Sequence, residues 1–573
     1  MNNYKELYTL WCQNATEDND LIEELKEVAG NEAEIQDRFY KSLEFGTAGL
    51  RGVIGAGTNR MNIYTVGQAT QGLAASLLKQ FEAPAVAIAY DSRIKSEVFA
   101  KRAACVLAAN GVKAYIFKEL VPTPVLSFAV RYLGCKSGIV ITASHNPSQY
   151  NGFKCYDPDG YQMTDESAAK TLAEIQSIDM FRDIKSIDFE AGLQAGTIEY
   201  CADEVMEAFL SEVQKQSVNP GICQESNLNL IYSPLNGTGN KPVREILKRI
   251  GIQNVRVVPE QELPDGNFPT CPYPNPEIRQ VFEKALDMTA GFDADLILAT
   301  DPDCDRVGIA VKDANGEYKL MSGNEVGAML LEYLLSQREE KGTMPPEPVA
   351  IKSFVTTNIA NKVAAKHGCR VKEVLTGFKY IGEYITELEK HGKENNFILG
   401  FEESYGYLSG THARDKDAVV ASMLICEMAA YYKSVGKSLI DVMQSLYQEF
   451  GIYKHTVISL QFEGAEGMQK MQDIMTKLRS EVISSLAGLK VEYFSDYKSL
   501  KRTNLATGQS EAILLPSANA LVYELEKDNL FIIRPSGTEP KIKAYITACT
   551  ATDAEAEGLT QKMQEDFKAL IGE

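Results

Sequence analysis

Three stretches of the chain repeat one pattern of apolar and polar positions. Each has a short apolar run, a small polar loop, a longer run with helical periodicity that ends at a glycine, and a second apolar run. The stretches are residues 86–117, 228–258 and 349–374, with glycines Gly111, Gly251 and Gly368. Because a crossover as long as a helix requires parallel strands, each stretch predicts a βαβ unit with ligand loops at the carboxyl ends of its strands. The alternative is chance recurrence of a unit that any α/β protein repeats.

The last part of the chain follows another pattern. Residues 520–550 alternate as three strands separated by a Lys-Asp-Asn turn and a polar loop, and residues 553–572 have helical periodicity. Residues 463–486 add a second amphipathic helix. These elements predict a smaller α+β domain at the carboxyl end.

Together these patterns predict an α/β fold class, with three related α/β domains that have mixed sheets and a smaller C-terminal α+β domain. A chain of 573 residues is too long for one core, and an apolar content of 45% suffices to fill several. We place the domains at residues 1–205, 206–320, 321–450 and 451–573.

Charge and composition limit which kinds of partner the protein can bind and where in the cell we expect it. A net charge of -20 disfavours nucleic acid and anionic membranes, which require a clustered basic face. The amino terminus lacks the basic start and apolar core of a secretory signal, and the richest apolar run, residues 418–432, contains Glu427 and is too short to span a bilayer. Eleven cysteines without a C-x-x-C pair are typical of reduced thiols in a core. We therefore expect a cytoplasmic protein without a membrane span.

An acidic loop is the strongest chemical signal. The stretch "DPDCDRVG", residues 301–308, directly follows an apolar strand and has carboxylates at alternate positions, Asp301, Asp303 and Asp305. Alternate side chains of an extended loop point the same way, so three carboxylates converge, which favours a hard cation such as Mg²⁺. An EF-hand is excluded because Arg306 and Lys312 occupy its glycine and glutamate positions. An aspartyl nucleophile and a solvated acidic loop are the alternatives.

A second loop, "RPSGTEPK" at residues 534–541, is suited to a phosphate. It follows an apolar strand and contains a guanidinium, two hydroxyls and a glycine, at Arg534, Ser536, Gly537 and Thr538. A polar hairpin turn is the alternative. Neither "YYKSVGKS" nor "GAGTNR" satisfies a nucleotide-binding motif, so no nucleotide site is predicted.

Ser144 lies in "ITASHNPSQYNGFKCY", residues 141–156, after an apolar strand. We expect His145 and the Asn-Pro turn to hold it exposed. The stretch lacks the G-x-S-x-G frame of a hydrolase, and no other histidine lies in a triad setting. Beside a metal loop and a phosphate loop, a serine that carries phosphate fits better than one that carries an acyl group.

Three further loops follow predicted strands. The stretch "GFEESYGY", residues 400–407, offers Glu402, Glu403 and Ser404 as partners for sugar hydroxyls. Lys416 lies between two aspartates, and Lys379 lies in "LTGFKYIG". Each of these loops alone is more often a solvated turn.

Five motifs in order resemble the α-D-phosphohexomutase family, in the branch that contains phosphoglucomutases and phosphopentomutases. They are "FGTAGLRG", "TASHNP" with "NGFK", "DPDCDR", "GFEESYG" and "RPSGTEP", and the resemblance runs from about residue 40 to the end. It implies four domains around a central cleft, and a phosphoglucomutase that interconverts glucose 1-phosphate and glucose 6-phosphate through a phosphoserine and glucose 1,6-bisphosphate. Phosphopentomutase and phosphomannomutase are the alternatives of the same mechanism.

The resemblance also implies roles for residues. Ser144 is the expected phosphoserine, which binds Mg²⁺ together with the three aspartates. Expected around the transferred group are Arg51, His145, Lys154 and Arg306, with Lys416 as a general base. Expected substrate contacts are Lys379, Glu402, Ser404, Arg534, Ser536, Gly537 and Thr538.

Because a rigid ring cannot bring both hydroxyls to one centre, we expect phospho-Ser144 to phosphorylate the free hydroxyl and the bisphosphate to turn over before it returns its other phosphate. Loss of this intermediate would leave Ser144 unphosphorylated, so a trace of sugar 1,6-bisphosphate should activate the enzyme. A mobile tail domain would let the intermediate turn. A regulatory protein that binds sugar phosphate without catalysis and a phosphatase are the competing hypotheses.

Overall fold

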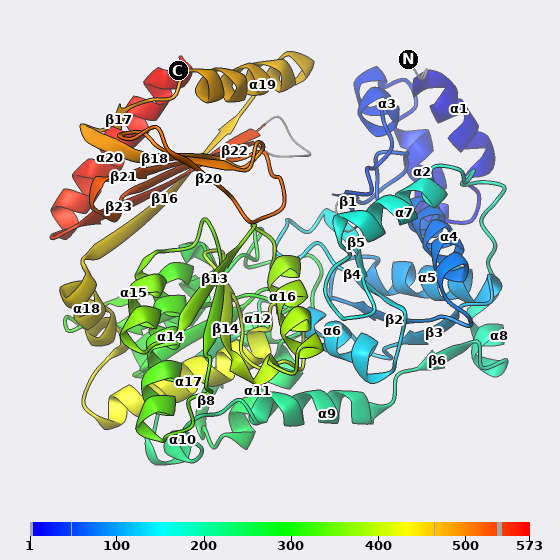
Figure 1. The fold of residues 1–573 in the computed structure, drawn as a ribbon. Coiled ribbons are helices and arrows are strands. Elements are labelled where there is room, and N and C mark those ends of the chain that lie inside the picture. Colours follow the sequence, from blue (N-terminus) through cyan, green and yellow to red (C-terminus); the bar gives the residue numbers. More distant parts are fainter. Residues whose placement is uncertain (1–3, 47–48, 463, 536–540, 573) are drawn as a thin grey trace. The chain divides into compact units, whose positions relative to one another are not determined.

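The computed structural model describes residues 4–46, 49–462, 464–535 and 541–572, without the side chains of 464–466. The chain forms two compact units. Figure 1 shows its helices and strands, with colours that follow the residue number. Unit 1 contains residues 1–323 and 378–438, and unit 2 contains residues 324–377 and 439–573. The border between the units crosses the predicted third domain, and the three boundaries between the four predicted domains stay predictions.

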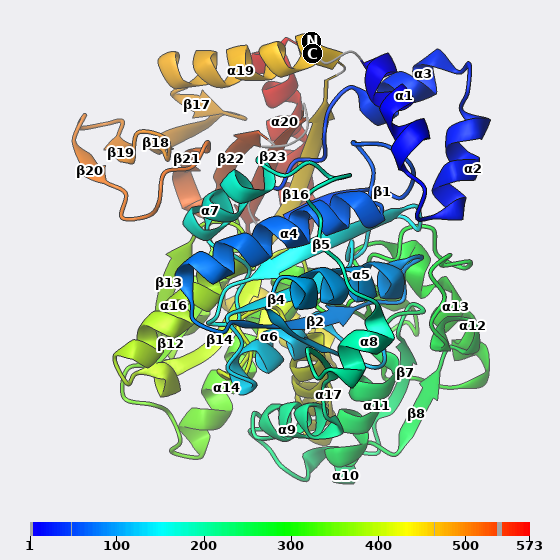
Figure 2. The same ribbon diagram turned by 90° about the vertical axis from the view of Figure 1, so that its right-hand side faces the viewer.

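Three helices precede the first sheet and were not predicted. They are α1 (Tyr4–Asn14), α2 (Asn19–Glu27) and α3 (Glu32–Phe39), which lie together in Figure 2. Trp11, the single tryptophan, is buried and packs edge to face against Phe39, Tyr64 and Phe181. The helices thereby join the core of the following domain.

The first sheet of unit 1 has the order β1-β5-β4-β2-β3-β6. The strands β4, β2, β3 and β6 are parallel, whereas β1 and β5 are antiparallel to their neighbours. Its strands are β1 (Gly49–Val53), β2 (Ala85–Tyr90), β3 (Lys113–Ile116), β4 (Ser137–Ile141), β5 (Tyr150–Tyr156) and β6 (Ile198–Tyr200). Its helices are α4 (Ile63–Gln80), α5 (Ser96–Ala109), α6 (Thr123–Tyr132), α7 (Asp165–Ile175) and α8 (Phe189–Gln194).

The second sheet has the order β11-β10-β9-β7-β8, with β9, β7 and β8 parallel. Its strands are β7 (Asn229–Ser233), β8 (Asn254–Val257), β9 (Leu296–Thr300), β10 (Val307–Lys312) and β11 (Tyr318–Met321). Helical segments of this region are α9 (Asp203–Gln214), α10 (Ile222–Glu225), α11 (Asn240–Arg249), α12 (Pro259–Glu262), η1 (Arg279–Phe282), α13 (Glu283–Met288) and η2 (Thr289–Gly291).

Unit 1 ends with a helix, a hairpin and a buried helix. These are α16 (Phe378–Lys390), η3 (Glu394–Asn396), β14 (Phe397–Glu402), β15 (Gly406–Leu408) and α17 (Ala418–Ser434). The buried helix predicted at 418–432 is confirmed as α17. Its carboxylate, Glu427, is tolerated in the core because it accepts hydrogen bonds from the Ser217 hydroxyl and from the amides of Val218 (2.9 Å) and Asn219 (3.1 Å).

Unit 2 begins with α14 (Gly323–Glu340) and the parallel pair β12 (Val349–Ser353) and β13 (Arg370–Val374) around α15 (Ile359–Lys366). Its carboxyl part is an antiparallel sheet of order β16-β23-β22-β21-β18-β19-β20. These elements are α18 (Leu439–Phe450), β16 (Ile452–Gln461), α19 (Gly464–Ser480), β17 (Ser485–Leu486), β18 (Leu489–Asp496), β19 (Lys501–Asn504), β20 (Ser510–Ala512), β21 (Leu521–Leu525), η4 (Glu526–Asp528), β22 (Leu530–Pro535), β23 (Lys541–Thr550) and α20 (Asp553–Ile571).

The predicted fold class and its elements are confirmed. All three βαβ units have parallel strands, and Gly111, Gly251 and Gly368 end their helices at φ of 79°, 91° and 65°. The eleven cysteines are free thiols, and all but Cys12 and Cys549 are buried. Among the described residues, no single helix is both long and apolar enough to cross a membrane. Only α17 and α18 taken together, as a pair bent by 85°, have the necessary length and composition.

Candidate active site

Ser144 lies three residues beyond β4, at the carboxyl end of the first sheet. Its backbone is left-handed, with φ of 50°, a conformation that costs a non-glycine residue about 1 kcal/mol or more. The Thr142 hydroxyl accepts a hydrogen bond from the Ser144 amide at 2.8 Å. The expectation that Ser144 is exposed is wrong: it is 2% exposed, because its side chain turns toward the acidic loop of the second sheet.

The acidic loop connects β9 to β10 and brings three carboxylates together. The Ser144 hydroxyl donates a hydrogen bond to Asp301 Oδ2 at 2.9 Å. Asp301 Oδ1 accepts from the amides of Asp305 (3.0 Å) and Arg306 (2.9 Å), which folds the loop around it. Oxygens of Asp301, Asp303 and Asp305 all lie within 4.8 Å of one another, and all three residues are buried.

This carboxylate cluster fits a divalent cation. Asp303 Oδ1 and Asp305 Oδ1 are buried and accept no hydrogen bond from any described residue. Burial raises the pKa of Asp301, and the charges of Asp303 and Asp305 raise it further. Buried like charges with free oxygens are the oxygen-rich donor set that Mg²⁺ prefers.

Two lysines neutralise part of the cluster. Lys154 Nζ, on β5, lies 3.0 Å from Asp303 Oδ2. Burial raises the pKa of Asp303, but Lys154, a hydrogen bond with Asp301 and the charge of Lys416 together outweigh burial and bring this pKa below its ordinary value. Lys416 Nζ lies 3.1 Å from Asp305 Oδ2 and 3.0 Å from Asp415 Oδ1.

Lys416 reaches the cluster across the hairpin of β14 and β15. A methyl group at Gly406 would lie 2.1 Å from Lys416 Cδ, so only glycine leaves room for the lysine. Burial lowers the pKa of Lys416, but Asp305 and Asp415 outweigh burial and raise it above its ordinary value. Lys416 is therefore an ammonium ion in this arrangement.

Three more of the predicted residues surround Ser144 and the acidic loop. His145 Nδ1 lies 3.2 Å from the Ser144 hydroxyl, and Arg51 donates to Asn146 Oδ1 at 3.2 Å. Burial lowers the pKa of His145, and Arg306 and Arg51 lower it further, so the ring is neutral. Arg306 donates to Glu277 at 2.8 Å.

The sugar-binding candidates of unit 1 come from two places, the end of β14 and the start of α16. Glu402 ends β14 and is buried, and Ser404 lies in the turn that follows. The Tyr405 carbonyl accepts from the Val307 amide at 3.1 Å, which holds this turn next to the acidic loop. Lys379 lies in the first turn of α16 rather than in a loop, and Lys379 Nζ is 2.7 Å from Asp165 Oδ1.

The phosphate-loop candidates belong to unit 2. Arg534 lies near the end of β22, opposite Lys543 in register. Ser536, Gly537 and Thr538 lie outside the described residues.

Several residues at the centre were missed by the sequence reasoning. Thr123 begins α6, and its hydroxyl donates to Asp303 Oδ2 at 3.1 Å. Asp91 and Arg93 follow β2, and Arg93 contacts the loop that carries Ser144. Their position after a predicted parallel strand next to β4 was a usable signal, because such strands end at one edge of the sheet.

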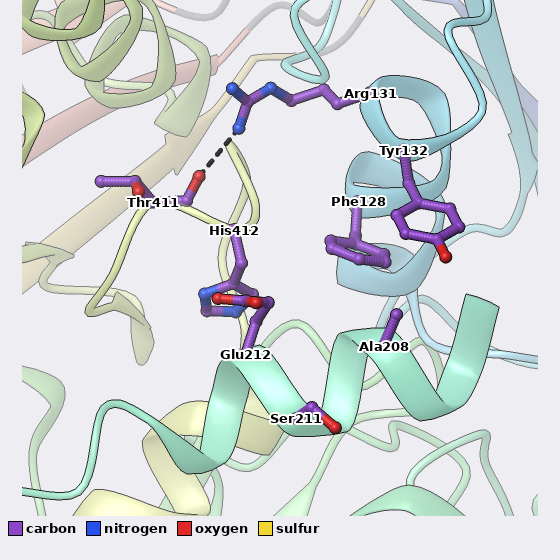
Figure 3. A pocket seen from close by; sticks show the side chains of 8 residues that line it. All are labelled: Phe128, Arg131, Tyr132, Ala208, Ser211, Glu212, Thr411 and His412. Carbon is purple, nitrogen blue, oxygen red and sulfur yellow. Dashed lines mark hydrogen bonds between the residues drawn. The ribbon is translucent and has the colours of Figure 1, made fainter. Parts of the chain in front are cut away.

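A separate hollow in unit 1 has a volume of about 580 Å³. Figure 3 shows it between α6, which supplies Phe128 and Tyr132, and α9, which supplies Ser211 and Glu212. Arg131 closes one side by donating to the Thr411 carbonyl at 2.8 Å. None of the predicted site residues lines this hollow.

Comparison with known proteins identifies the family. Models of the phosphoglucomutase/phosphomannomutase alpha/beta/alpha domains I, II and III match residues 42–182, 207–316 and 322–450, and that of its C-terminal domain matches residues 499–565. The chain belongs to the phosphoglucomutase/phosphomannomutase family, which confirms the resemblance seen in the motifs.

Among curated relatives, the phosphoglucomutase of Staphylococcus haemolyticus is 38% identical, over 89% of this chain and 91% of the relative. That of Staphylococcus aureus is 36% identical, over 94% and 95%. A putative phosphomannomutase from Thermus thermophilus has a similar fold, with a TM-score of 0.69 at 23% identity over 93% of this chain and 100% of that chain. The Paramecium phosphoglucomutase parafusin has a TM-score of 0.66 at 16% identity over 93% and 95%.

Proposed function

We propose that this protein is a phosphoglucomutase that interconverts glucose 1-phosphate and glucose 6-phosphate through a phosphoserine at Ser144. The observation that carries the proposal is the Ser144 hydroxyl 2.9 Å from Asp301, inside a buried cluster of three carboxylates. The identities of 36% and 38% to phosphoglucomutases favour glucose over mannose or pentose phosphates.

In the first half-reaction the bond between phosphorus and Ser144 Oγ breaks, and a new bond joins phosphorus to the free hydroxyl oxygen of the sugar. The hydroxyl proton passes to a base, the departing Ser144 Oγ takes up a proton, and the products are glucose 1,6-bisphosphate and free Ser144. The bisphosphate turns, and the second half-reaction returns its other phosphoryl group to Ser144. A bisphosphate that escapes leaves Ser144 unphosphorylated, so added glucose 1,6-bisphosphate activates the enzyme.

Asp301, Asp303 and Asp305 would hold Mg²⁺ together with an oxygen of phospho-Ser144. Bound there, Mg²⁺ would supply positive charge to the oxygens of the transferring group. The transferring phosphoryl group would be surrounded by four residues of unit 1: Lys154, His145, Arg51 and Arg306. Glu402, Ser404 and Lys379 would bind the sugar, and Arg534 with Ser536, Gly537 and Thr538 would bind the other phosphate.

Lys416 is our candidate for the base, with one condition. As an ammonium ion between Asp305 and Asp415 it donates protons rather than accepting them. If Asp305 bound a cation other than Lys416, the pKa of Lys416 would fall, and its amine could then accept the hydroxyl proton. The ammonium form suits the opposite direction, in which a proton returns to the departing sugar oxygen.

The test is phosphorus NMR of the purified protein with Mg²⁺, a trace of glucose 1,6-bisphosphate, and glucose 1-phosphate or ribose 1-phosphate in separate tubes. We expect the glucose 1-phosphate signal to be replaced by that of glucose 6-phosphate without inorganic phosphate. Ser144→Ala should abolish this conversion. Ser76→Ala, which alters another buried serine of the same domain, should leave it intact.

The same spectra separate the competing functions. Release of inorganic phosphate would identify a phosphatase, and conversion of ribose 1-phosphate alone would identify a phosphopentomutase. No change in either tube, with wild type and Ser144→Ala alike, would favour a non-catalytic binding protein.

A further inference from the structure

One buried guanidinium in unit 1 has no place in the proposed chemistry, although it contacts the loop that carries Ser144. Arg93 lies three residues beyond β2 and is 3% exposed. A buried arginine is costly unless its donors are paired, so its partners indicate its role.

The two terminal nitrogens of Arg93 donate to backbone carbonyls of the loop between β4 and β5 and of the first residue of β5. Nη2 donates to the carbonyls of Ser144 (2.6 Å) and Asn146. Nη1 donates to those of Pro147 (2.8 Å) and Tyr150 (3.1 Å). One planar group therefore binds four carbonyls across seven residues of chain, including the carbonyl of the reacting serine itself.

The guanidinium is itself held in place. Its Nε lies 3.3 Å from Asp91 Oδ2, and Asp91 Oδ1 accepts from the Arg93 amide (2.9 Å) and the Ser96 hydroxyl (2.7 Å). The same Ser96 hydroxyl accepts from Asn151 Nδ2 at 3.0 Å, which fastens the far end of the loop. The Phe268 ring covers the guanidinium, with its centre 5.0 Å from Cζ.

The loop requires such a partner. Ser144 is left-handed, and the turn aims several carbonyl oxygens inward, where each would lose its hydrogen bond to water. Arginine is the side chain with a flat fork of five donors, which can satisfy several carbonyls at fixed angles. Lysine has three donors on one atom and cannot span the same set.

We propose that Arg93 is a positioning residue for phosphoryl transfer, which holds the Ser144 loop so that Oγ faces Asp301. The inference rests on the proposed function and adds to it a residue that does not touch the transferred group. Misplacement of a reacting atom by about 1 Å costs on the order of 100-fold in rate. Loss of Arg93 should therefore slow the chemical step more than it weakens substrate binding.

The experiment compares wild type with Arg93→Lys in the glucose 1-phosphate assay and in a second assay, phosphorylation of Ser144 by glucose 1,6-bisphosphate followed by intact mass. We expect kcat and the rate of Ser144 phosphorylation to fall by about 100-fold, with KM changed by less than about 3-fold. Arg60→Lys is the matched control, because Arg60 is a buried, ion-paired arginine of the same domain outside the site.

Circular dichroism and calorimetry decide whether each variant is folded. If Arg93→Lys does not fold, Asp91→Asn replaces it, since it leaves the arginine in place and removes only the charge that orients it. There we expect kcat to fall by about 10-fold with KM unchanged.

A folded variant with kcat and phosphorylation rate within about 3-fold of wild type would overturn the inference, as would equal losses in Arg60→Lys. Failure of the proposed function has a different signature. Wild type would then show neither turnover nor a phosphate on Ser144.

Discussion

Single residues in strained conformations shape three loops of the candidate site. Ser144, Cys304 and Tyr405 are left-handed, at φ of 50°, 52° and 66°. Each lies in a turn directly after a strand of unit 1, and each costs about 1 to 2 kcal/mol relative to a relaxed residue. Hydrogen bonds hold these turns: the Thr142 hydroxyl accepts from the Ser144 amide, and the Tyr405 carbonyl accepts from the Val307 amide.

The single residue Lys154 balances part of the negative charge of the carboxylate cluster, so its removal should change the stability of the protein. Lys154→Met removes the cation 3.0 Å from Asp303 and leaves the buried carboxylates less compensated. We expect the protein without divalent ions to lose about 3 kcal/mol of stability. With millimolar Mg²⁺ the difference from wild type should become smaller, because a cation held by the three aspartates replaces the lost charge. Calorimetry with EDTA and with Mg²⁺ measures both.

Lys79→Met is the control, because Lys79 is 67% exposed and pairs with Glu174 on the surface. Its effect should stay below about 1 kcal/mol and should not respond to Mg²⁺. A deficit in Lys154→Met that Mg²⁺ does not change would argue against a cation at the cluster.

At the scale of elements, glycines mark where helices end. Gly111 follows α5 at φ of 79°, and a methyl group there would meet no atom within 4 Å. Gly558 lies inside α20, also with open space around it, but without a positive φ. The two positions therefore differ in backbone conformation and not in crowding.

We predict opposite effects of the same substitution. Gly111→Ala should destabilise unit 1 by about 1 to 2 kcal/mol, because alanine disfavours the left-handed region. Gly558→Ala should stabilise unit 2 by about 0.5 to 1 kcal/mol, because alanine restricts the unfolded chain and favours the helix. Shifts of the same sign in calorimetry would contradict this account.

At the scale of the whole molecule, the chain is divided differently from its sequence repeats. The segment 322–450 matches one family domain, yet residues 324–377 belong to unit 2 and residues 378–438 to unit 1. Each unit has its own core, so we expect two calorimetric transitions rather than one. Gly111→Ala should shift only the transition of unit 1 and Gly558→Ala only that of unit 2, so the two variants show which transition belongs to which unit.

Acid should act on unit 2 through His455. Burial and the nearby Lys352 lower the pKa of this histidine from its ordinary 6.5 to about 3. Between these values the unfolded chain binds a proton that the folded unit does not, so stability is lost as the pH falls from 6.5 toward 3. His455→Gln should flatten the pH dependence of the unit 2 transition in this window. His391→Gln changes a histidine of unit 1 whose side chain is 63% exposed, and it should leave this dependence unchanged. Equal slopes in wild type and His455→Gln would contradict this role.

The elements and much of the site were predictable because their signals are local. An apolar run followed by Ser144, or by the three aspartates, places each group at the carboxyl end of a strand, where α/β sheets carry their ligand loops. The two strands belong to different sheets, so only the packing of these sheets against each other brings Ser144 to Asp301. The helices α1 to α3 were missed, because short polar segments with few apolar positions give a weak periodic signal.

The sequence by itself determined the βαβ units, their glycine helix ends, the C-terminal antiparallel strands and the order of the motifs, since these depend on neighbouring residues and on periodicity. Only the tertiary structure decided that Ser144 is buried, that Lys416 is clamped by two carboxylates, and that Arg93 binds four carbonyls 51 to 57 residues along the chain. Hydrogen bonds and charge interactions act through space, so partners distant in sequence leave no mark on local pattern.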